Sequence, residues 1–224
     1  MDNLKRTTDK FWPGITQILQ ESQSIFNGVY RWGIYGDSVR KQDDLQHSYS
    51  ITILASIFMT KINLYNRPID QALVLNAFLI HDYGEGLLGR DICLNDKAKY
   101  DDLDEYLTFI DKHSLLDKNV FDRFHRAYLL QYAIDEQRSD FPPIAQEIIA
   151  SLRASQMIEV LIFRAVETWE YILYALEQHY NGHETILAEV LNNAKKRISF
   201  LTDNLPGFKE VIWTKEIAMA FQNL

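Results

Sequence analysis

Residues 69–82 read IDQALVLNAFLIHD, and this segment decides the fold class. Pro68 stands directly before it, where the fixed backbone dihedral of proline suits the first turn of a helix. Apolar side chains would occupy nearly every side of that helix, which is typical of a buried central element and not of a surface helix. The sequence therefore predicts a helix at the centre of the fold that ends near Gly84 and Gly86.

Amphipathic segments with helical spacing lie on both sides of this central helix. Two precede it, over about residues 8–24 and from Gln46 to Ile62, and residues 27–45 between them are irregular. Six follow it, over about residues 97–112, 117–135, 143–154, 156–179, 184–203 and 208–223. Because the 224 residues include only 9 Gly and 5 Pro, turns are too scarce for a many-stranded sandwich or barrel. We therefore expect an all-α fold with eight or nine helices in a single domain.

The composition excludes several classes of protein. A hydrophobic fraction of 47% excludes disorder as the main state, and a formal net charge of −8 disfavours an extended nucleic-acid surface. No apolar run approaches the roughly 18 residues that span a bilayer, and the polar start MDNLKRTTDK lacks the apolar region of a secretory leader. The single Cys93 excludes a disulfide framework. We therefore expect a cytoplasmic location, no membrane association and no extended nucleic-acid partner.

His81 and Asp82 end the central helix and suggest a metal site. A carboxylate there faces the negative end of the helix dipole, and burying it without a partner would cost several kcal/mol. His47 lies four residues before Ile51 and so extends the apolar face of its own helix toward the core. Two imidazoles and a carboxylate make a mixed site that suits Mn, Fe, Co, Ni or Zn, and Mg less well. The alternative is a hydrogen-bonded core histidine and an ordinary turn aspartate.

Glu85 is a candidate proton acceptor beside that site. It follows His81 by four residues and Asp82 by three, which places the side chains on one face if the helical turn continues. A carboxylate next to a metal-bound water can take its proton near neutral pH. The alternative is a solvated loop glutamate.

The helix expected over residues 156–179 offers further carboxylates, which are Glu159, Glu167, Glu170 and Glu177. They form either a solvated acidic stripe or one wall of a cleft, and periodicity leaves both interpretations open. The four remaining histidines are expected at the surface or at helix ends, with no role, and these are His113, His125, His179 and His183.

Two arginines in the irregular stretch are candidate ligands for an anion. In a chain of net charge −8, an anionic substrate needs cations placed locally, and a guanidinium binds phosphate through two parallel hydrogen bonds. Arg31 and Arg40 are such cations, and Trp32 beside the first offers a flat surface for a sugar or base. The alternatives are surface ion pairs for the arginines and a loop-anchoring core position for the tryptophan.

Three segments form an ordered pattern. RWGIYGDSVRKQDDLQHSYSITILA (31–55) contains an Arg-Trp pair, a further Arg and a His that opens a helix. LIHDYGEGLLGRDI (79–92) contains His-Asp, a Glu three residues after the Asp, and then a Gly and an Asp-Ile. FRAVETWEYILYALEQ (163–178) places an acidic residue on a helix with a Glu three residues later. Together, over about residues 25–180, they resemble the HD-domain phosphohydrolases and, among these, the 5′-deoxynucleotidase branch.

The resemblance implies roles for individual residues. One divalent ion (Co, Mn, Zn, Fe, Ni or Mg) would be held by His47, His81, Asp82 and Glu167. Glu85 would be the general base and Arg31 would grip the phosphate. Trp32 would press on the deoxyribose and disfavour a 2′-hydroxyl, and Asp91 would contact the sugar or the leaving oxygen. Arg40 is a further candidate for substrate binding.

The function implied is a phosphomonoesterase that removes the 5′-phosphate from (deoxy)nucleoside monophosphates with a metal-activated water, in a homodimer. The expected organisation is an N-terminal helix (1–24), an HD core (25–182) and a C-terminal helical extension (183–224). The third segment departs from the family pattern because Glu167 stands where the family has Asp. Asp91 lies one residue further from the His-Asp pair than in the family, and the spacing from Arg31 to the first ligand is one residue longer. The alternatives are an inactive sensor or scaffold and a hydrolase for another nucleotide phosphate.

Overall fold

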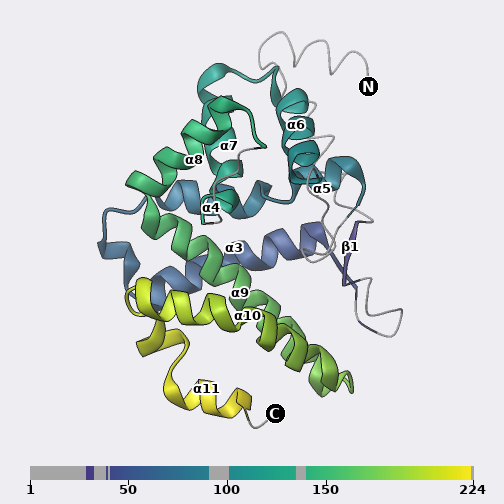
Figure 1. Ribbon diagram of the computed structural model, residues 1–224, viewed down its shortest axis with the longest axis vertical. Coiled ribbons are helices and arrows are strands. Elements are labelled where there is room, and N and C mark those ends of the chain that lie inside the picture. Colours follow the sequence, from purple (N-terminus) through teal and green to yellow (C-terminus); the bar gives the residue numbers. More distant parts are fainter. Residues whose placement is uncertain (1–28, 33–38, 40, 91–100, 135–139, 223–224) are drawn as a thin grey trace.

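Figure 1 shows the computed structural model of the protein, which describes residues 29–32, 39, 41–90, 101–134 and 140–222. Within this part of the chain, the regular structure consists of nine α-helices, three short helical turns of other pitch and one two-stranded sheet. The prediction of an all-α fold is therefore confirmed. The helix predicted for residues 8–24, and the site candidates Arg40 and Asp91, lie outside the described residues.

Where the structure describes the connections between consecutive elements, these connections are short. The α-helices are α3 (Asp44–Lys61), α4 (Gln71–Ile80), α5 (Tyr83–Leu88), α6 (Asp101–His113), α7 (Lys118–Tyr128), α8 (Pro143–Ser155), α9 (Met157–Tyr180), α10 (Glu184–Asn204) and α11 (Lys215–Gln222). The shorter elements are the turns η2 (Leu64–Asn66), η3 (Leu129–Tyr132) and η4 (Phe208–Ile212) and the strands β1 (Tyr30–Arg31) and β2 (Gln42–Asp43). None of the described helices is long and apolar enough to cross a membrane.

Two aspartates begin the helices that carry the site. The Asp43 carboxylate accepts a hydrogen bond from the backbone N–H of Gln46 at 2.7 Å and caps α3. Asp70 caps α4 in the same way, because its carboxylate accepts from the N–H of Leu73 at 2.9 Å. Each side chain satisfies one backbone donor that the first helical turn leaves without a partner.

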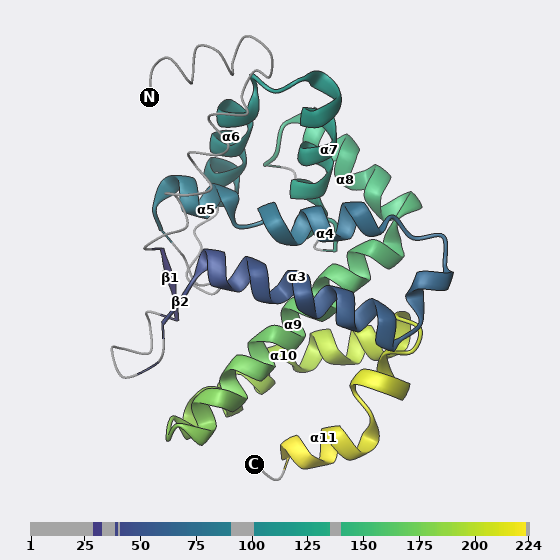
Figure 2. The same cartoon turned by 180° about the vertical axis from the view of Figure 1, so that it is seen from behind.

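Helix α4 occupies the central position that its sequence predicts. It packs against α3 on one side and α7 on the other, and α9 contacts both α3 and α4 (Figure 2). Val74, Ala77 and Phe78 are completely buried, and the Phe78 ring stacks on Phe163 of α9 with 4.7 Å between ring centroids. Only one side of α4 faces solvent, where Leu79 is 48% exposed.

The chain turns directly after α4, and here the predicted helix end is wrong. α4 ends at Ile80, and a new helix, α5, contains both Gly84 and Gly86. A Cβ at Gly84 would lie 2.5 Å from the Tyr128 hydroxyl and 2.8 Å from the Glu105 carbonyl oxygen, closer than real Cβ contacts. The glycine at position 84 is therefore needed for the close packing of α5 against α6 and α7, and it does not end a helix.

The C-terminal segment predicted as one helix over residues 208–223 is divided into η4 and α11. Between them Trp213 adopts a non-helical backbone conformation, with φ −117° and ψ 58°. Its ring packs edge-on against Trp169 of α9 and nearly parallel to Phe221 of α11, with 6.4 and 5.5 Å between centroids. Packing of this one ring between two helices accompanies the break.

Candidate metal centre

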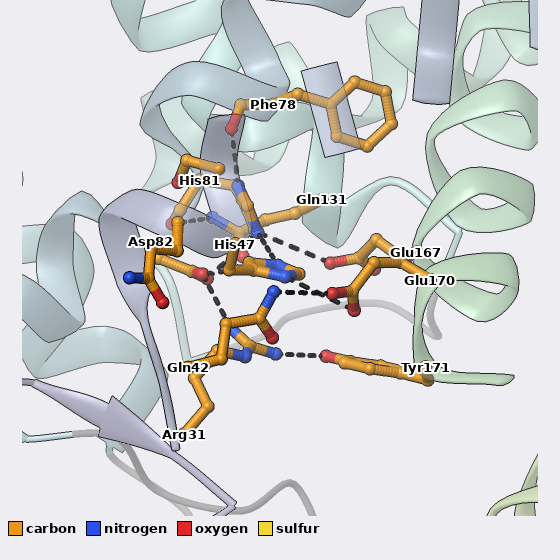
Figure 3. Close-up of polar contacts among 12 residues, drawn as sticks. Arg31, Gln42, His47, Phe78, His81, Asp82, Gln131, Glu167, Glu170 and Tyr171 are labelled. Carbon is orange, nitrogen blue, oxygen red and sulfur yellow. Dashed lines mark hydrogen bonds and ion pairs between the residues drawn. The ribbon is translucent and has the colours of Figure 1, made fainter. Parts of the chain in front are cut away.

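Three side chains meet in the interior beside α9, as Figure 3 shows. His47 comes from α3, and His81 and Asp82 form the turn between α4 and α5. The Nε2 atoms of the two histidines are 3.3 Å apart, and Asp82 lies 3.1 Å from His81 Nε2 and 3.6 Å from His47 Nε2. All three residues are buried, and one ligand atom from each lies within 4.8 Å of the other two. This donor set suits a divalent transition-metal ion.

The imidazole of His81 is oriented by the backbone carbonyl of Phe78, and the turn that carries it is held by Gln131. Its Nδ1 lies 3.1 Å from the carbonyl oxygen of Phe78, and because a carbonyl only accepts, Nδ1 carries the proton. In the neutral imidazole, Nε2 then keeps its lone pair and faces the centre. The side chain of Gln131, in η3, donates to the backbone carbonyl of His81 at 2.8 Å and holds the turn.

Glu167 reaches the same centre from α9. Its Oε1 lies 3.6 Å from His81 Nε2, and its Oε2 lies 3.6 Å from Nη1 of Arg164, one turn earlier on the helix. The group of three tightly clustered ligands does not include it. Glu167 therefore lies beside the centre, with one carboxylate oxygen near His81 and the other paired with Arg164.

The surrounding charges set the protonation of the centre. Burial, together with nearby Arg31, lowers the pKa of His47. Burial opposes ionisation of Asp82, but His81 and Arg31 outweigh burial and hold the pKa of that carboxyl well below its usual range. Burial also opposes protonation of His81, but the Asp82 carboxylate outweighs it and raises the pKa of the imidazole. Asp82 is therefore ionised and His47 neutral, which are the states in which each can ligate a metal.

Arg31 lies directly against the centre and is not a surface residue. β1 pairs with β2 in antiparallel register, with Arg31 opposite Gln42, and this pairing brings the arginine beside the first turn of α3. Its Nη1 donates to Asp82 Oδ2 at 2.7 Å, and its Nη2 donates to the Tyr171 hydroxyl, also at 2.7 Å. The guanidinium thus supplies positive charge to a predicted metal ligand.

Trp32, the residue after Arg31, packs against two tyrosine rings of α9. Its ring stacks face to face on Tyr174, with 4.2 Å between centroids, and meets Tyr171 edge-on at 5.8 Å. Its backbone has φ 68°, a conformation that a bulky residue adopts only at a cost of about 1–3 kcal/mol. Packing against α9 therefore anchors this residue.

Glu85 is buried, with 7% of its surface exposed, and lies in the first turn of α5. The alternative of a solvated loop glutamate is therefore wrong. The positive end of the α5 dipole favours an ionised carboxylate there.

Two residues near the centre had no role in the sequence analysis. Glu170 Oε2 lies 3.4 Å from Nδ1 of His47, and its Oε1 accepts from Gln42 Nε2 at 2.9 Å. The position of Glu170, three residues after Glu167 on one helix, is a signal that places it on the same face. For Gln42 no local signal exists, because its place depends on the pairing of two strands that are each two residues long.

Two of the remaining histidines lie at helix ends, as predicted, because His113 ends α6 and His125 is in the last turn of α7, but both are buried. His113 is 2% exposed and packs against Phe109, whose carbonyl oxygen lies 2.7 Å from its Nδ1. His125 is 5% exposed and lies 3.1 Å from the Tyr106 hydroxyl, and burial lowers its pKa to about 4. Both are core residues that pack among aromatic rings, and neither belongs to the cluster formed by His47, His81 and Asp82.

The family profile described as HD domain matches residues 28–199. The chain therefore belongs to the HD-domain family, which is part of a superfamily of metal-dependent phosphohydrolases. Neither the curated proteins nor the solved structures that were compared include a match. The resemblance to HD-domain proteins is confirmed, and the 5′-deoxynucleotidase branch stays a prediction.

Proposed function

We propose that this protein is a metal-dependent phosphomonoesterase that removes the 5′-phosphate from (deoxy)nucleoside monophosphates. The observation that carries the proposal is the convergence of His47, His81 and Asp82 with a buried arginine at their edge. A single divalent ion would be held by these three residues together with Glu167. Such an ion lowers the pKa of water and offsets the charge of a phosphate.

Arg31 would bind the phosphate of the substrate. Its guanidinium now compensates the Asp82 carboxylate, and a cation at the centre would take over that compensation. Nη1 would then be available to a phosphate oxygen, while the bond from Nη2 to Tyr171 keeps the guanidinium plane in place. Charge developing on the phosphoryl group would be stabilised by a donor that is already positioned.

Glu85 would accept the proton of the attacking water. The residue is a buried carboxylate in the turn that follows His81 and Asp82, and it is held in helix α5 and not in a loop. A general base must be ionised and fixed in position. The first turn of α5 meets both conditions, because the helix dipole stabilises the carboxylate and the helix fixes the backbone that carries it.

Trp32 would form one wall for the sugar or base of the substrate. The stack on Tyr174 fixes the plane of its indole, so that the ring meets a ligand without losing conformational freedom. Arg40 and Asp91, which the resemblance also assigns to the substrate, remain predictions.

The test is phosphate release from a panel of ribo- and deoxynucleoside 5′-monophosphates with Mn, Co, Zn or Mg. We expect release with at least one metal and a loss of about 100-fold or more in Glu85→Ala, as is usual for a general base. Glu189→Ala, an exposed glutamate of α10, is the matched control and should be as active as the wild type. No release with any metal, or equal rates in Glu85→Ala and the wild type, would refute the proposal.

One observation favours a second candidate, a protein that binds nucleotide and metal without turnover. Glu167 stands where the family has Asp, and one of its oxygens faces Arg164 and not the centre. If this carboxylate cannot complete the ligand set, the site would bind a nucleotide and release no phosphate. Isothermal titration with the same nucleotides, alongside the activity assay, distinguishes the two candidates.

The homodimer and the cytoplasmic location remain proposals. Light scattering tests the first, because a mass of one 26.2 kDa chain would contradict a dimer. Fractionation of cells that produce the protein tests the second.

A further inference from the structure

Glu170 and the metal centre contact opposite edges of one imidazole. Nε2 of His47 faces His81 and Asp82, whereas Nδ1 on the other edge of the ring lies 3.4 Å from Glu170 Oε2 (Figure 3). His47 is 0% exposed and Glu170 is 5% exposed, so neither can turn to water instead. Within the described part of the chain, neither of these two atoms has a partner that meets hydrogen-bond geometry, so their 3.4 Å separation is a close polar contact. Nδ1 of His47 and Oε2 of Glu170 are therefore two buried polar atoms in contact with each other.

The carboxylate of Glu170 is itself held from the other side. Gln42 Nε2 donates to its Oε1 at 2.9 Å, and Gln42 is 4% exposed. β2 carries Gln42, opposite Arg31 of β1, so the same short hairpin reaches the site at two points. With one oxygen committed to Gln42, only the other oxygen remains to face His47.

We propose that Glu170 is a positioning residue that keeps the proton of neutral His47 on Nδ1, so that the lone pair of Nε2 faces the metal centre. An ionised carboxylate only accepts hydrogen bonds, and a neutral imidazole has one donor and one acceptor nitrogen. A carboxylate beside Nδ1 therefore selects the tautomer in which Nε2 is the free ligand atom. The inference rests on the metal centre of the proposed function and adds a residue to it.

The substitution Glu170→Gln is expected to reverse the tautomer. The Gln42 amide N–H₂ donates toward the position of Oε1, so the oxygen of the introduced amide takes that position. The nitrogen of the introduced amide then faces His47 and donates to Nδ1. The ring proton moves to Nε2, where it blocks the ligand atom.

A double variant separates this effect from a general loss of structure. Gln42→Glu combined with Glu170→Gln exchanges the amide and the carboxylate and conserves net charge. The carboxylate introduced at position 42 accepts from the amide at position 170, whose oxygen then faces His47 Nδ1. The original tautomer is expected to return, although the chain carries two substitutions.

Long-range ¹H–¹⁵N NMR of the histidine rings, recorded without metal, reads the tautomer directly. We expect protonated Nδ1 in the wild type, protonated Nε2 in Glu170→Gln and protonated Nδ1 again in the double variant. Isothermal titration with Mn or Co should show a dissociation constant about 10- to 100-fold larger in Glu170→Gln, with recovery in the double variant. Glu177→Gln, an exposed position two turns later on α9, is the matched control for both measurements.

Two results would overturn the inference. One is a wild-type His47 with its proton on Nε2, and the other is a Glu170→Gln variant whose tautomer and metal affinity equal those of Glu177→Gln. Because the tautomer is measured without metal, it decides the role of Glu170 even if the wild type binds none of the metals. That last result would instead refute the proposed function.

Discussion

Replacement of Arg31 by methionine is expected to destabilise the metal-free protein, because Asp82 then loses its cationic partner. The two side chains are each 9% exposed, with 2.7 Å between Nη1 and Oδ2. Removing one member of a buried ion pair costs about 3–5 kcal/mol. His81 Nε2 remains 3.1 Å from the other Asp82 oxygen and keeps part of the compensation. We therefore expect a loss of about 3 kcal/mol, which lowers Tm by roughly 6–12 °C in a chain of this size.

Urea unfolding in the presence of a chelator, followed by tryptophan fluorescence, measures this loss. The matched control is Arg90→Met. Arg90 lies 3.1 Å from Asp101, but its side chain is 44% exposed, so solvent screening limits the cost to below about 1 kcal/mol. If Arg31→Met lost no more stability than Arg90→Met, the interpretation of Arg31 as the cation that compensates Asp82 would be wrong.

The same variant tests whether Arg31 and a metal ion serve one carboxylate. A cation at the centre would compensate Asp82 in place of the guanidinium. Added Mn or Co is therefore expected to raise the stability of Arg31→Met more than that of the wild type. An equal increase in both proteins would contradict this shared role.

Three further predictions follow from the packing and charges of the site. Gly84→Ala should cost about 1–3 kcal/mol in urea unfolding, because its Cβ would meet Tyr128 and a backbone carbonyl; a loss below about 1 kcal/mol would contradict the close packing of α5. The lowered pKa of Asp82 contributes stability that is present above its unfolded pKa of about 4 and is lost as pH falls further. Unfolding in a chelator between pH 5 and 3 should therefore have a smaller pH slope in Asp82→Asn, and an equal slope would refute that assignment. Tyr171→Phe removes the acceptor of Arg31 Nη2 and should raise KM severalfold in the phosphate-release assay, whereas an unchanged KM would exclude a role in holding the guanidinium.

Periodicity predicted the helices that carry the ligands, because burial of an apolar face is a local property of the sequence. The stripe that begins near His47 is α3, and the apolar segment before His81 is α4. The ends of helices were predicted less well. Gly84 lies inside α5, since its role is to let another helix approach, and such an approach has no signature in the neighbouring residues.

The position of the candidate ligands also followed from local pattern. His47 lies on the buried face of one helix, and His81 and Asp82 end the next helix, so packing of α3 against α4 brings them together. Periodicity alone did not distinguish this cluster from separate core residues, and the resemblance to the HD family was what favoured a metal site. The placement of Glu167 beside the same cluster depends on how α9 crosses both helices.

Local sequence pattern was sufficient to predict an all-α fold around one central helix. It also identified the candidate ligands, which are His47 in the first turn of α3 and His81 and Asp82 after the end of α4. Only the folded chain shows that Arg31 compensates Asp82, and that Glu170, held by Gln42, contacts the far edge of the His47 ring. The physical reason is the range of the interactions. Helix formation and the burial of one face depend on residues a few positions apart, whereas these contacts join residues 51, 128 and 123 positions apart through strand pairing and helix crossing.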